Sequence, residues 1–168
     1  LSATLVQAPS TPVILPGCIA GESLLSQIIV DKFLYHLPEY RQAKRFKELG
    51  VEISTSSMNR WVHATADKLY GLYAAQMERV LSAGYIQVDE TTHPITDRPG
   101  SARKGYIWVV RSVLVPGVFF YYDKGSRSGE VVLKMLKGYQ GALQTDGYAA
   151  YSIFEEKKGV LPLGCMAH

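Results

Sequence analysis

The sequence predicts an α/β protein in which a helical region precedes a mixed β-sheet. Two observations support this prediction. Up to Gly84, apolar residues recur at three- and four-residue steps, which is the spacing of amphipathic helices. Beyond Gly84 they form short runs separated by Pro, Gly, Asp and Ser, as strands and turns do. We therefore expect a helical region with an extended lead-in over residues 1–84 and a sheet region over residues 85–168.

Three helices are expected in the first region. Pro38 stops the first, and the second ends at Gly50, the residue best able to adopt the left-handed conformation that follows a helix. Ser54 or Thr55 caps the third and longest helix, which Gly84 closes. The turn at Gly50 fits both a helix-turn-helix and a plain helical hairpin, so both interpretations stay open. The expected helices cover residues 22–37, about 39–49 and about 55–84.

The second region is expected to follow the order β-β-β-α-β-α-β. Three strands in a row favour an antiparallel meander, and each of the last two strands is entered through a helix. A mixed sheet covered by helices is the natural assembly of these elements. The expected strands are residues 85–89, 106–110, 117–122, 142–145 and 160–163, and the expected helices are residues 128–137 and 151–157.

Composition limits the classes of function. The hydrophobic share of 47% and the charged share of 20% are those of a soluble globular protein, and no apolar run is long enough to span a membrane. A net charge of +3 allows a polyanionic partner without requiring one. The two cysteines, Cys18 and Cys165, are far apart in sequence, which favours free thiols in a reducing compartment. We therefore expect a cytoplasmic protein.

Two aspartates stand at the carboxyl ends of expected strands. Asp89 follows the apolar run of the first strand, and Asp146 follows that of the fourth. If these strands lie side by side, both carboxylates emerge at the same edge of the sheet. Their oxygens would suit Mg²⁺ or Mn²⁺, and such a site supports metal-assisted phosphoryl transfer. Aspartates at strand ends also commonly cap turns, and the spacing alone favours this simpler interpretation.

Several linked motifs lie in the second half of the chain. They are Asp89-Glu90-Thr91 and residues 104–109, 126–128, 141–151 and 164–168. In order and spacing, these motifs resemble the transposases of the bacterial insertion sequence 66 family. Residues 37–42, 50–54 and 61–62 resemble the helical region that precedes the catalytic core in that family, so the resemblance covers nearly the whole chain.

The resemblance implies a ribonuclease-H-like fold with a DDE active site that cuts transposon ends and joins them to target DNA. Motif matching makes Asp89 the first acid and Asp146 the second, with Mg²⁺ as cofactor and Mn²⁺ as its substitute. The third acid of the family is a glutamate on a helix downstream of the Cys-x-Ala-His segment, and this chain ends at His168. Glu90 is no substitute, because it should point to the other side of the strand from Asp89. We therefore expect the chain alone to be inactive or nearly so.

Basic residues are the expected contacts with double-stranded DNA. Four lie in the second helix with no acid among them, two in the loop expected between the first two strands, and two after the third strand. A solvated protein surface is the competing interpretation for each group. The resemblance also implies transposon ends and target DNA as partners, self-association of the full-length protein, and a place at the bacterial nucleoid. The basic residues are Arg41, Lys44, Arg45, Lys47, Arg103, Lys104, Lys124 and Arg127.

Two other functions stay open. The chain could be a non-catalytic DNA-binding or interaction fragment of a decayed mobile element, which a downstream helix bearing a suitable glutamate would argue against. It could also belong to an ordinary ribonuclease-H-like nuclease that hydrolyses DNA without joining it, which strand-transfer products would exclude.

Overall fold

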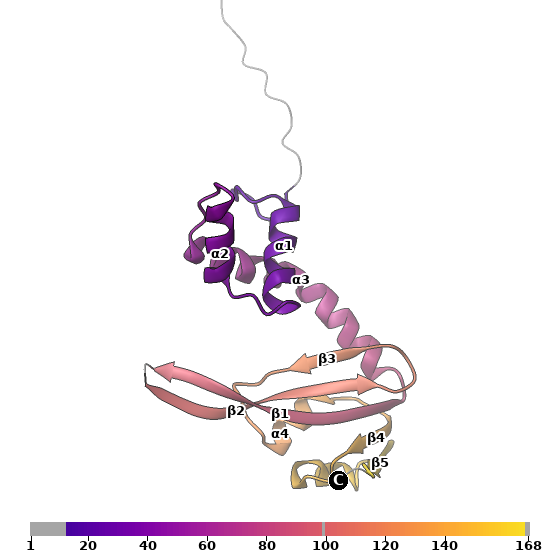
Figure 1. The fold of residues 1–168 in the computed structure, drawn as a ribbon. Coiled ribbons are helices and arrows are strands. Elements are labelled where there is room, and N and C mark those ends of the chain that lie inside the picture. The colour runs from indigo at the N-terminus through magenta and orange to yellow at the C-terminus, as the bar shows by residue number, and fades with distance from the viewer. Residues whose placement is uncertain (1–12, 99, 167–168) are drawn as a thin grey trace, which may run out of the picture. The chain divides into compact units, whose positions relative to one another are not determined.

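A computed structural model of the protein describes residues 13–98 and 100–166, with side chains described except those of residues 97 and 98. The chain forms two compact units, one ending at Tyr70 and the other beginning at Gly71, and helix α3 contributes to both (Figure 1). Most of the lead-in expected before the first helix lies outside the described residues. Among the described residues, none of the helices combines the length and the apolar character that a membrane span requires. The helices of the N-terminal region are α1 (Glu22–Phe33), α2 (Glu39–Glu48) and α3 (Thr55–Leu81).

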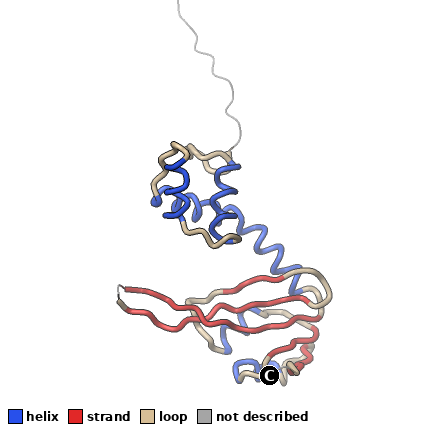
Figure 2. The backbone as a smooth tube through the Cα atoms, viewed as in Figure 1, coloured by secondary structure: helices blue, strands red, loops and turns tan. Residues whose placement is uncertain are grey.

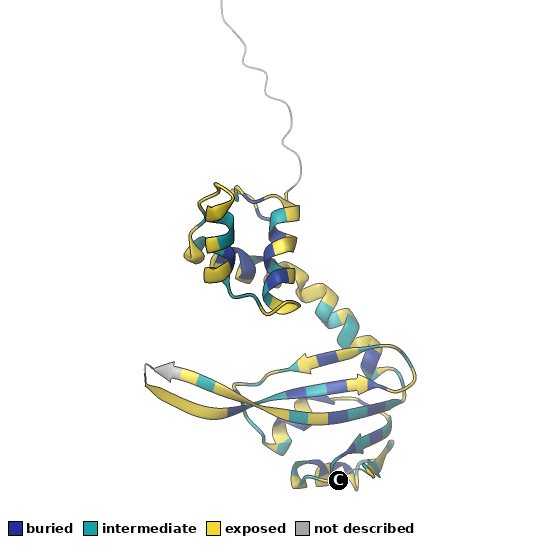
Figure 3. Ribbon diagram, in the orientation of Figure 1, coloured by how far each residue is buried: buried dark blue, intermediate teal, exposed yellow. Residues whose placement is uncertain are grey.

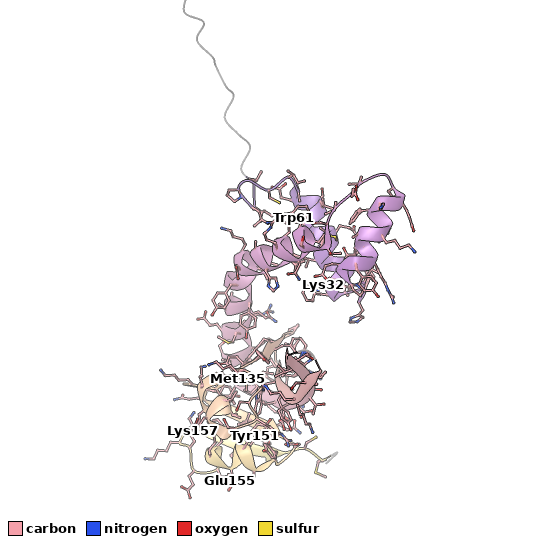
Figure 4. The ribbon with its side chains drawn as sticks, turned by 90° about the vertical axis from the view of Figure 1, so that its left-hand side faces the viewer. Lys32, Trp61, Met135, Tyr151, Glu155 and Lys157 are labelled. Carbon is pink, nitrogen blue, oxygen red and sulfur yellow. The ribbon has the colours of Figure 1, made fainter. Side chains whose placement is uncertain are left out.

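The N-terminal unit is built from α1, α2 and the first part of α3. The predicted left-handed end of the second helix is confirmed, since Gly50 has a φ of 83°. The first helix ends four residues earlier than predicted, because His36 adopts a φ of 54° and turns the chain out of the helix ahead of Pro38. Trp61 lies on α3 in this unit (Figure 4). The buried apolar residues of the unit include Leu25, Ile28, Met58, Trp61 and Val62.

Polar contacts fasten α2 to α1. Arg45 forms an ion pair with Asp31, whose exposed fraction is only 3%. The ammonium group of Lys32 donates to Glu39 at 2.7 Å and, as the largest of several causes, lowers the pKa of that carboxyl. The buried Gln42 donates its amide to the carbonyl of Leu37 at 2.8 Å. These contacts fix which side of α2 faces the unit and which side faces solvent.

The second unit contains a five-stranded mixed sheet with the strand order β3-β2-β1-β4-β5 (Figure 2). Strands β1, β2 and β3 form the predicted antiparallel meander, while β4 pairs in parallel with both β1 and β5. The predicted element order is therefore confirmed, and the domain has a ribonuclease-H-like α/β fold. The elements are β1 (Tyr85–Arg98), β2 (Ser101–Ser112), β3 (Val118–Tyr121), α4 (Gly129–Met135), β4 (Gly141–Thr145), a 3₁₀ helix η1 (Ala149–Phe154) and β5 (Val160–Gly164).

One face of the sheet carries the hydrophobic core. Strand residues of this face pack with Val80 near the end of α3, with α4 and with η1 in one buried cluster. In Figure 3 the buried positions gather along these elements, while the far part of the β1–β2 hairpin is exposed. The strand residues in the cluster are Ile86, Val88, Trp108, Val110, Phe119 and Leu143.

The first two strands are much longer than predicted. A loop was expected over residues 90–105, but β1 and β2 continue to pair as far as Arg98 and Ser101, and form an arm that extends past the neighbouring strands (Figure 1). The described side chains of the arm are mostly exposed. A two-stranded arm with solvent on both faces does not need alternating apolar residues, so its sequence lacks the period-2 signal that identifies a half-buried strand. The second helix expected in this region is a 3₁₀ helix at residues 149–154.

Candidate active site

The parallel pairing of β1 with β4 sets the positions of the two aspartates. The last paired residues are Gln87 and Gln144, and Asp89 and Asp146 each lie two residues further along. The amide of Gln87 donates to the side-chain oxygen of Gln144 at 2.7 Å, which shows that these paired residues point to the same face. Because side chains alternate along a strand, Asp89 points to this face too. It is the face opposite the hydrophobic core.

Both aspartates line a single cavity of about 270 Å³. The structure thus brings together two side chains that are remote in sequence, at the edge where β1 and β4 part. Sequence reasoning placed Asp89 at the end of its strand, which is wrong, because β1 continues beside β2 to Arg98. The pairing of β1 with β4, in contrast, ends at Gln87, and the divergence of the two strands leaves the space beside Asp89. The cavity is also lined by Gln87, Gln144, Arg111 and Cys165.

Each aspartate uses one carboxylate oxygen to hold the local backbone. Asp89 Oδ1 accepts the amide of Glu90 at 2.8 Å, and Asp146 Oδ1 accepts the amide of Tyr148 at 2.9 Å in a turn typical of aspartate. No described group donates a hydrogen bond to the Oδ2 atom of either aspartate. One oxygen of each carboxylate therefore has no donor among the described groups, and oxygen ligands of this kind suit a Mg²⁺ or Mn²⁺ ion that keeps several waters.

The donor set is small. Among the described residues, no three His, Cys, Asp or Glu side chains are grouped closely enough to hold a metal ion. The chemistry of Asp89 and Asp146 fits a divalent cation, but it supplies only two charged ligands.

Glu90 lies on the core face of β1, as predicted, and takes part in a buried polar network. Its carboxylate side chain is only 1% exposed. Arg127 donates through Nε to Glu90 Oε1 at 2.7 Å, and the Tyr151 hydroxyl donates to Oε2 at 2.8 Å. The hydrogen bond to Glu90 raises the pKa of the Arg127 guanidinium. Burial raises the pKa of the Tyr151 hydroxyl far above its ordinary value, and Glu90 raises it further, so this hydroxyl stays a donor.

Arg127, one of the expected DNA contacts, also packs against two aromatic rings of the protein. Its guanidinium carbon lies 3.7 Å from the centre of the Tyr148 ring and 5.2 Å from that of Tyr106. The Arg127 side chain is still 35% exposed, so these contacts leave part of it open to solvent. Its role in DNA binding stays a prediction.

The other basic residues of the sheet unit lie on the hairpin arm and beside it. Arg103 and Lys104 were expected in a loop, but they belong to β2 and are exposed there. Both terminal nitrogens of Arg103 donate to the carbonyl of Lys124 at 3.3 Å. This contact brings basic residues of two separate segments together at the base of the arm. Arg103 and Lys104 come from β2, and Lys124 comes from the turn after β3.

The basic residues of α2 divide into two groups. Arg41, Lys44 and Lys47 are exposed and spaced three residues apart, so they lie near one another on the solvent side of the helix. Arg45 instead contacts Asp31 and holds α2 against α1. Arg45 therefore stabilises the packing of α2 against α1, a role that was not predicted from the sequence.

Sequence reasoning missed several residues of the cavity and of the network behind it. Arg111 lines the cavity, and its neighbours in sequence, Val110 and Ser112, are both buried. This alternation could have placed Arg111 on the face of the sheet opposite the core. Cys165 reaches the cavity because its amide donates to the Thr145 carbonyl at 2.9 Å, continuing the β4–β5 pairing. The partners of Glu90 carried no such signal, since they lie 37 and 61 residues away in sequence.

The fold and the paired aspartates define a ribonuclease-H-like domain with an acidic site at the edge between its first and fourth strands. The comparison with protein families agrees and is more specific. A family model described as "Transposase IS66 family" matches residues 17–168. The chain belongs to this transposase family.

Three curated proteins of Sinorhizobium fredii are similar to the chain. The uncharacterized protein y4qI is 31% identical over 98% of this chain and 33% of its own length. The uncharacterized protein y4jD is 30% identical over 92% of this chain and 32% of its own length, and y4hP is 33% identical over 81% and 26%. The chain thus spans about a third of the length of the curated relatives it matches.

Gly125 offers a test of how the basic residues at the arm are positioned. A Cβ at Gly125 would overlap Ile95 Cδ1 and lie 3.0 Å from Gly105 Cα, and the φ of Gly125 is +73°. Gly138 has a similar φ of +79° but no neighbour within 4 Å of its Cβ. We predict that Gly138→Ala costs roughly 1–2 kcal/mol of stability, from the left-handed backbone alone. Gly125→Ala should cost at least about 1 kcal/mol more, because of the added overpacking.

Urea unfolding of the two variants measures this difference. Equal losses would show that the turn at Lys124 is not held against the arm.

Proposed function

We propose that this domain is the catalytic core of a DDE-type DNA transposase, with Asp89 and Asp146 as the acids that hold Mg²⁺ against the DNA phosphate. The observation that carries the proposal is the cavity lined by both aspartates, in a chain that belongs to a transposase family. Mn²⁺ would substitute for Mg²⁺, since both are hard ions that bind carboxylate oxygens.

Each group in the cavity has a proposed task. Asp89 and Asp146 offer their Oδ2 atoms to the ion, while their Oδ1 atoms stay bonded to the backbone. Arg111 adds a positive charge to the cavity wall and is suited to bind a phosphate oxygen. When bound, a divalent ion would offset the charge that develops on the phosphate and lower the barrier to displacement at phosphorus.

The reaction sequence follows from the family. Water would first attack the phosphodiester at the transposon end and release a 3′-hydroxyl. This hydroxyl would then attack a phosphodiester of the target DNA, so that one bond forms at phosphorus as another breaks. The same two aspartates would serve both steps.

Double-stranded DNA is the proposed partner, bound by two groups of exposed basic residues. The first is the strip on α2 made of Arg41, Lys44 and Lys47, and the second is the group at the arm made of Arg103, Lys104 and Lys124. Contacts of this kind supply affinity without reading sequence. We further propose self-association of the full-length protein and a place at the bacterial nucleoid, where both DNA substrates are found.

The chain by itself is proposed to cleave DNA slowly or not at all. Two carboxylates are too few to organise two ions, and no third acidic group lies with them among the described residues. The same observation favours one alternative, a DNA-binding fragment without catalytic activity. Incubation with cognate ends and Mn²⁺ tests this alternative, since any strand-transfer product would exclude it.

Metal binding is the direct test of the two aspartates. We predict that Mn²⁺ binds the chain weakly, and that Asp89→Asn and Asp146→Asn each weaken binding about tenfold or more, because each removes a charged ligand while keeping an oxygen for the backbone amide. The free Mn²⁺ signal in electron paramagnetic resonance measures the bound fraction. Glu155→Gln, at an exposed position outside the cavity, is the control. Unchanged binding in both aspartate variants would refute the proposed metal site.

DNA binding by the strip on α2 can be tested separately from metal binding. Replacing Arg41, Lys44 and Lys47 by alanine should weaken DNA binding. It should also reduce the magnitude of the slope of log affinity against log salt by up to about 2.7, because each lost phosphate contact reduces that slope by about 0.9. Arg45 is left intact because it neutralises Asp31. Fluorescence anisotropy with a labelled duplex at several salt concentrations measures both effects.

The charge-matched control removes three exposed lysines outside both basic groups. A slope change as large as that of the α2 variant would show that net charge alone matters and that the strip makes no direct contact. The control positions are Lys68, Lys137 and Lys158.

A further inference from the structure

The two aspartates are not held together by the sheet itself. The backbone pairing of β1 with β4 ends at Gln87 and Gln144, two residues short of Asp89 and Asp146. Beyond that point β1 follows β2 into the arm, and the chain after β4 enters a turn and then η1. Another set of contacts has to fix the separation of the two carboxylates.

The Glu90 network, made of Glu90, Arg127, Tyr148 and Tyr151, is attached to the first aspartate through the backbone. Glu90 directly follows Asp89, and its own amide donates to Asp89 Oδ1 at 2.8 Å. The Glu90 side chain is buried on the opposite face of β1 and bonded at both oxygens. Fixing the Glu90 side chain therefore fixes the peptide unit that orients Asp89.

The same network is attached to the second aspartate. The amide of Tyr148 donates to Asp146 Oδ1 at 2.9 Å, and the ring of Tyr148 lies under the Arg127 guanidinium at 3.7 Å. The amide of Tyr151 donates to the Tyr148 carbonyl at 2.9 Å, and the Tyr151 hydroxyl donates to Glu90 Oε2. Tyr151, labelled on η1 in Figure 4, is buried, and its ring also packs edge-on against Trp108 and Tyr148.

We propose that Glu90 is a positioning residue: through Arg127 and Tyr151 it clamps the turn that carries Asp146 to the strand that carries Asp89. This inference rests on the proposed metal site, since its purpose is to set the distance between the two ligands. Groups that orient metal ligands commonly affect metal affinity by about 10- to 100-fold although they do not touch the ion. The Glu90 network has this relation to both aspartates at once.

Two conservative variants test the clamp. Tyr151→Phe removes only the hydroxyl that bonds to Glu90, and Glu90→Gln keeps the shape of the side chain but removes its charge. We expect each to weaken Mn²⁺ binding to the chain by about tenfold, with the chain still folded by circular dichroism. Asp123→Asn is the control, because it breaks the Lys134–Asp123 ion pair of 2.7 Å, which is attached to neither aspartate.

Hydrogen exchange gives a second measurement that does not involve the metal. The amide of Tyr148 is protected by its bond to Asp146, so in Tyr151→Phe it should exchange about tenfold faster, while amides of β2 stay unchanged. A merely stabilising role for Glu90 would instead speed exchange throughout the sheet in step with the lost stability.

The outcomes separate this proposal from the proposed function. If Asp89→Asn leaves Mn²⁺ binding unchanged, the metal site itself is wrong. If Asp89→Asn weakens binding while Tyr151→Phe binds Mn²⁺ like the wild type and keeps Tyr148 protected, the metal site stands and the clamp is wrong. Tyr151→Phe decides the matter even if Glu90→Gln does not fold.

Discussion

The site depends on how far β1 and β4 stay paired. Their parallel register brings Gln87 opposite Gln144, and the alternation of side chains then directs Asp89 away from the core, toward the cavity that Asp146 also lines. A register shift of one residue would bury one aspartate against Val88 and its neighbours, where an unpaired charge is costly. The hydrophobic core on one face of the sheet thus decides the chemistry on the other.

Burial and charge are divided between the two faces of β1 at consecutive positions. Asp89 is exposed and has one carboxylate oxygen without a described protein donor, whereas the Glu90 carboxylate is buried and bonded at both oxygens. A buried carboxylate persists only when it is paired, and Arg127 supplies the opposite charge while Tyr151 supplies a neutral donor. Two adjacent acids therefore have different tasks because the strand turns them to different environments.

Much of this arrangement was predictable from the sequence. The change from helical to strand spacing at Gly84 indicated the order of the elements. The apolar runs before Asp89 and Asp146 indicated that the two aspartates would lie close together, although Asp89 does not end its strand. The family resemblance, carried by motifs such as Asp89-Glu90-Thr91, is confirmed by the family match over residues 17–168. These features could be predicted because each depends on residues that are close together in the sequence.

The features that were missed depend on contacts between distant residues or on backbone pairing. The β1–β2 arm has no alternating apolar pattern, because solvent surrounds it, so Arg103 and Lys104 were expected in a loop. Arg45 and Arg127 look like other basic residues in sequence, and only the fold shows that each neutralises a buried acid. Spacing along the chain carries no information about such partners.

The central claim is that Asp89 and Asp146 hold one divalent ion between them. Crystals of the chain soaked in MnCl₂, with anomalous diffraction recorded at the manganese edge, test it most directly. The account predicts an anomalous peak between the two carboxylates, within bonding distance of an oxygen of each. Well-ordered aspartates with no peak between them, or a peak bound elsewhere on the chain, would contradict it.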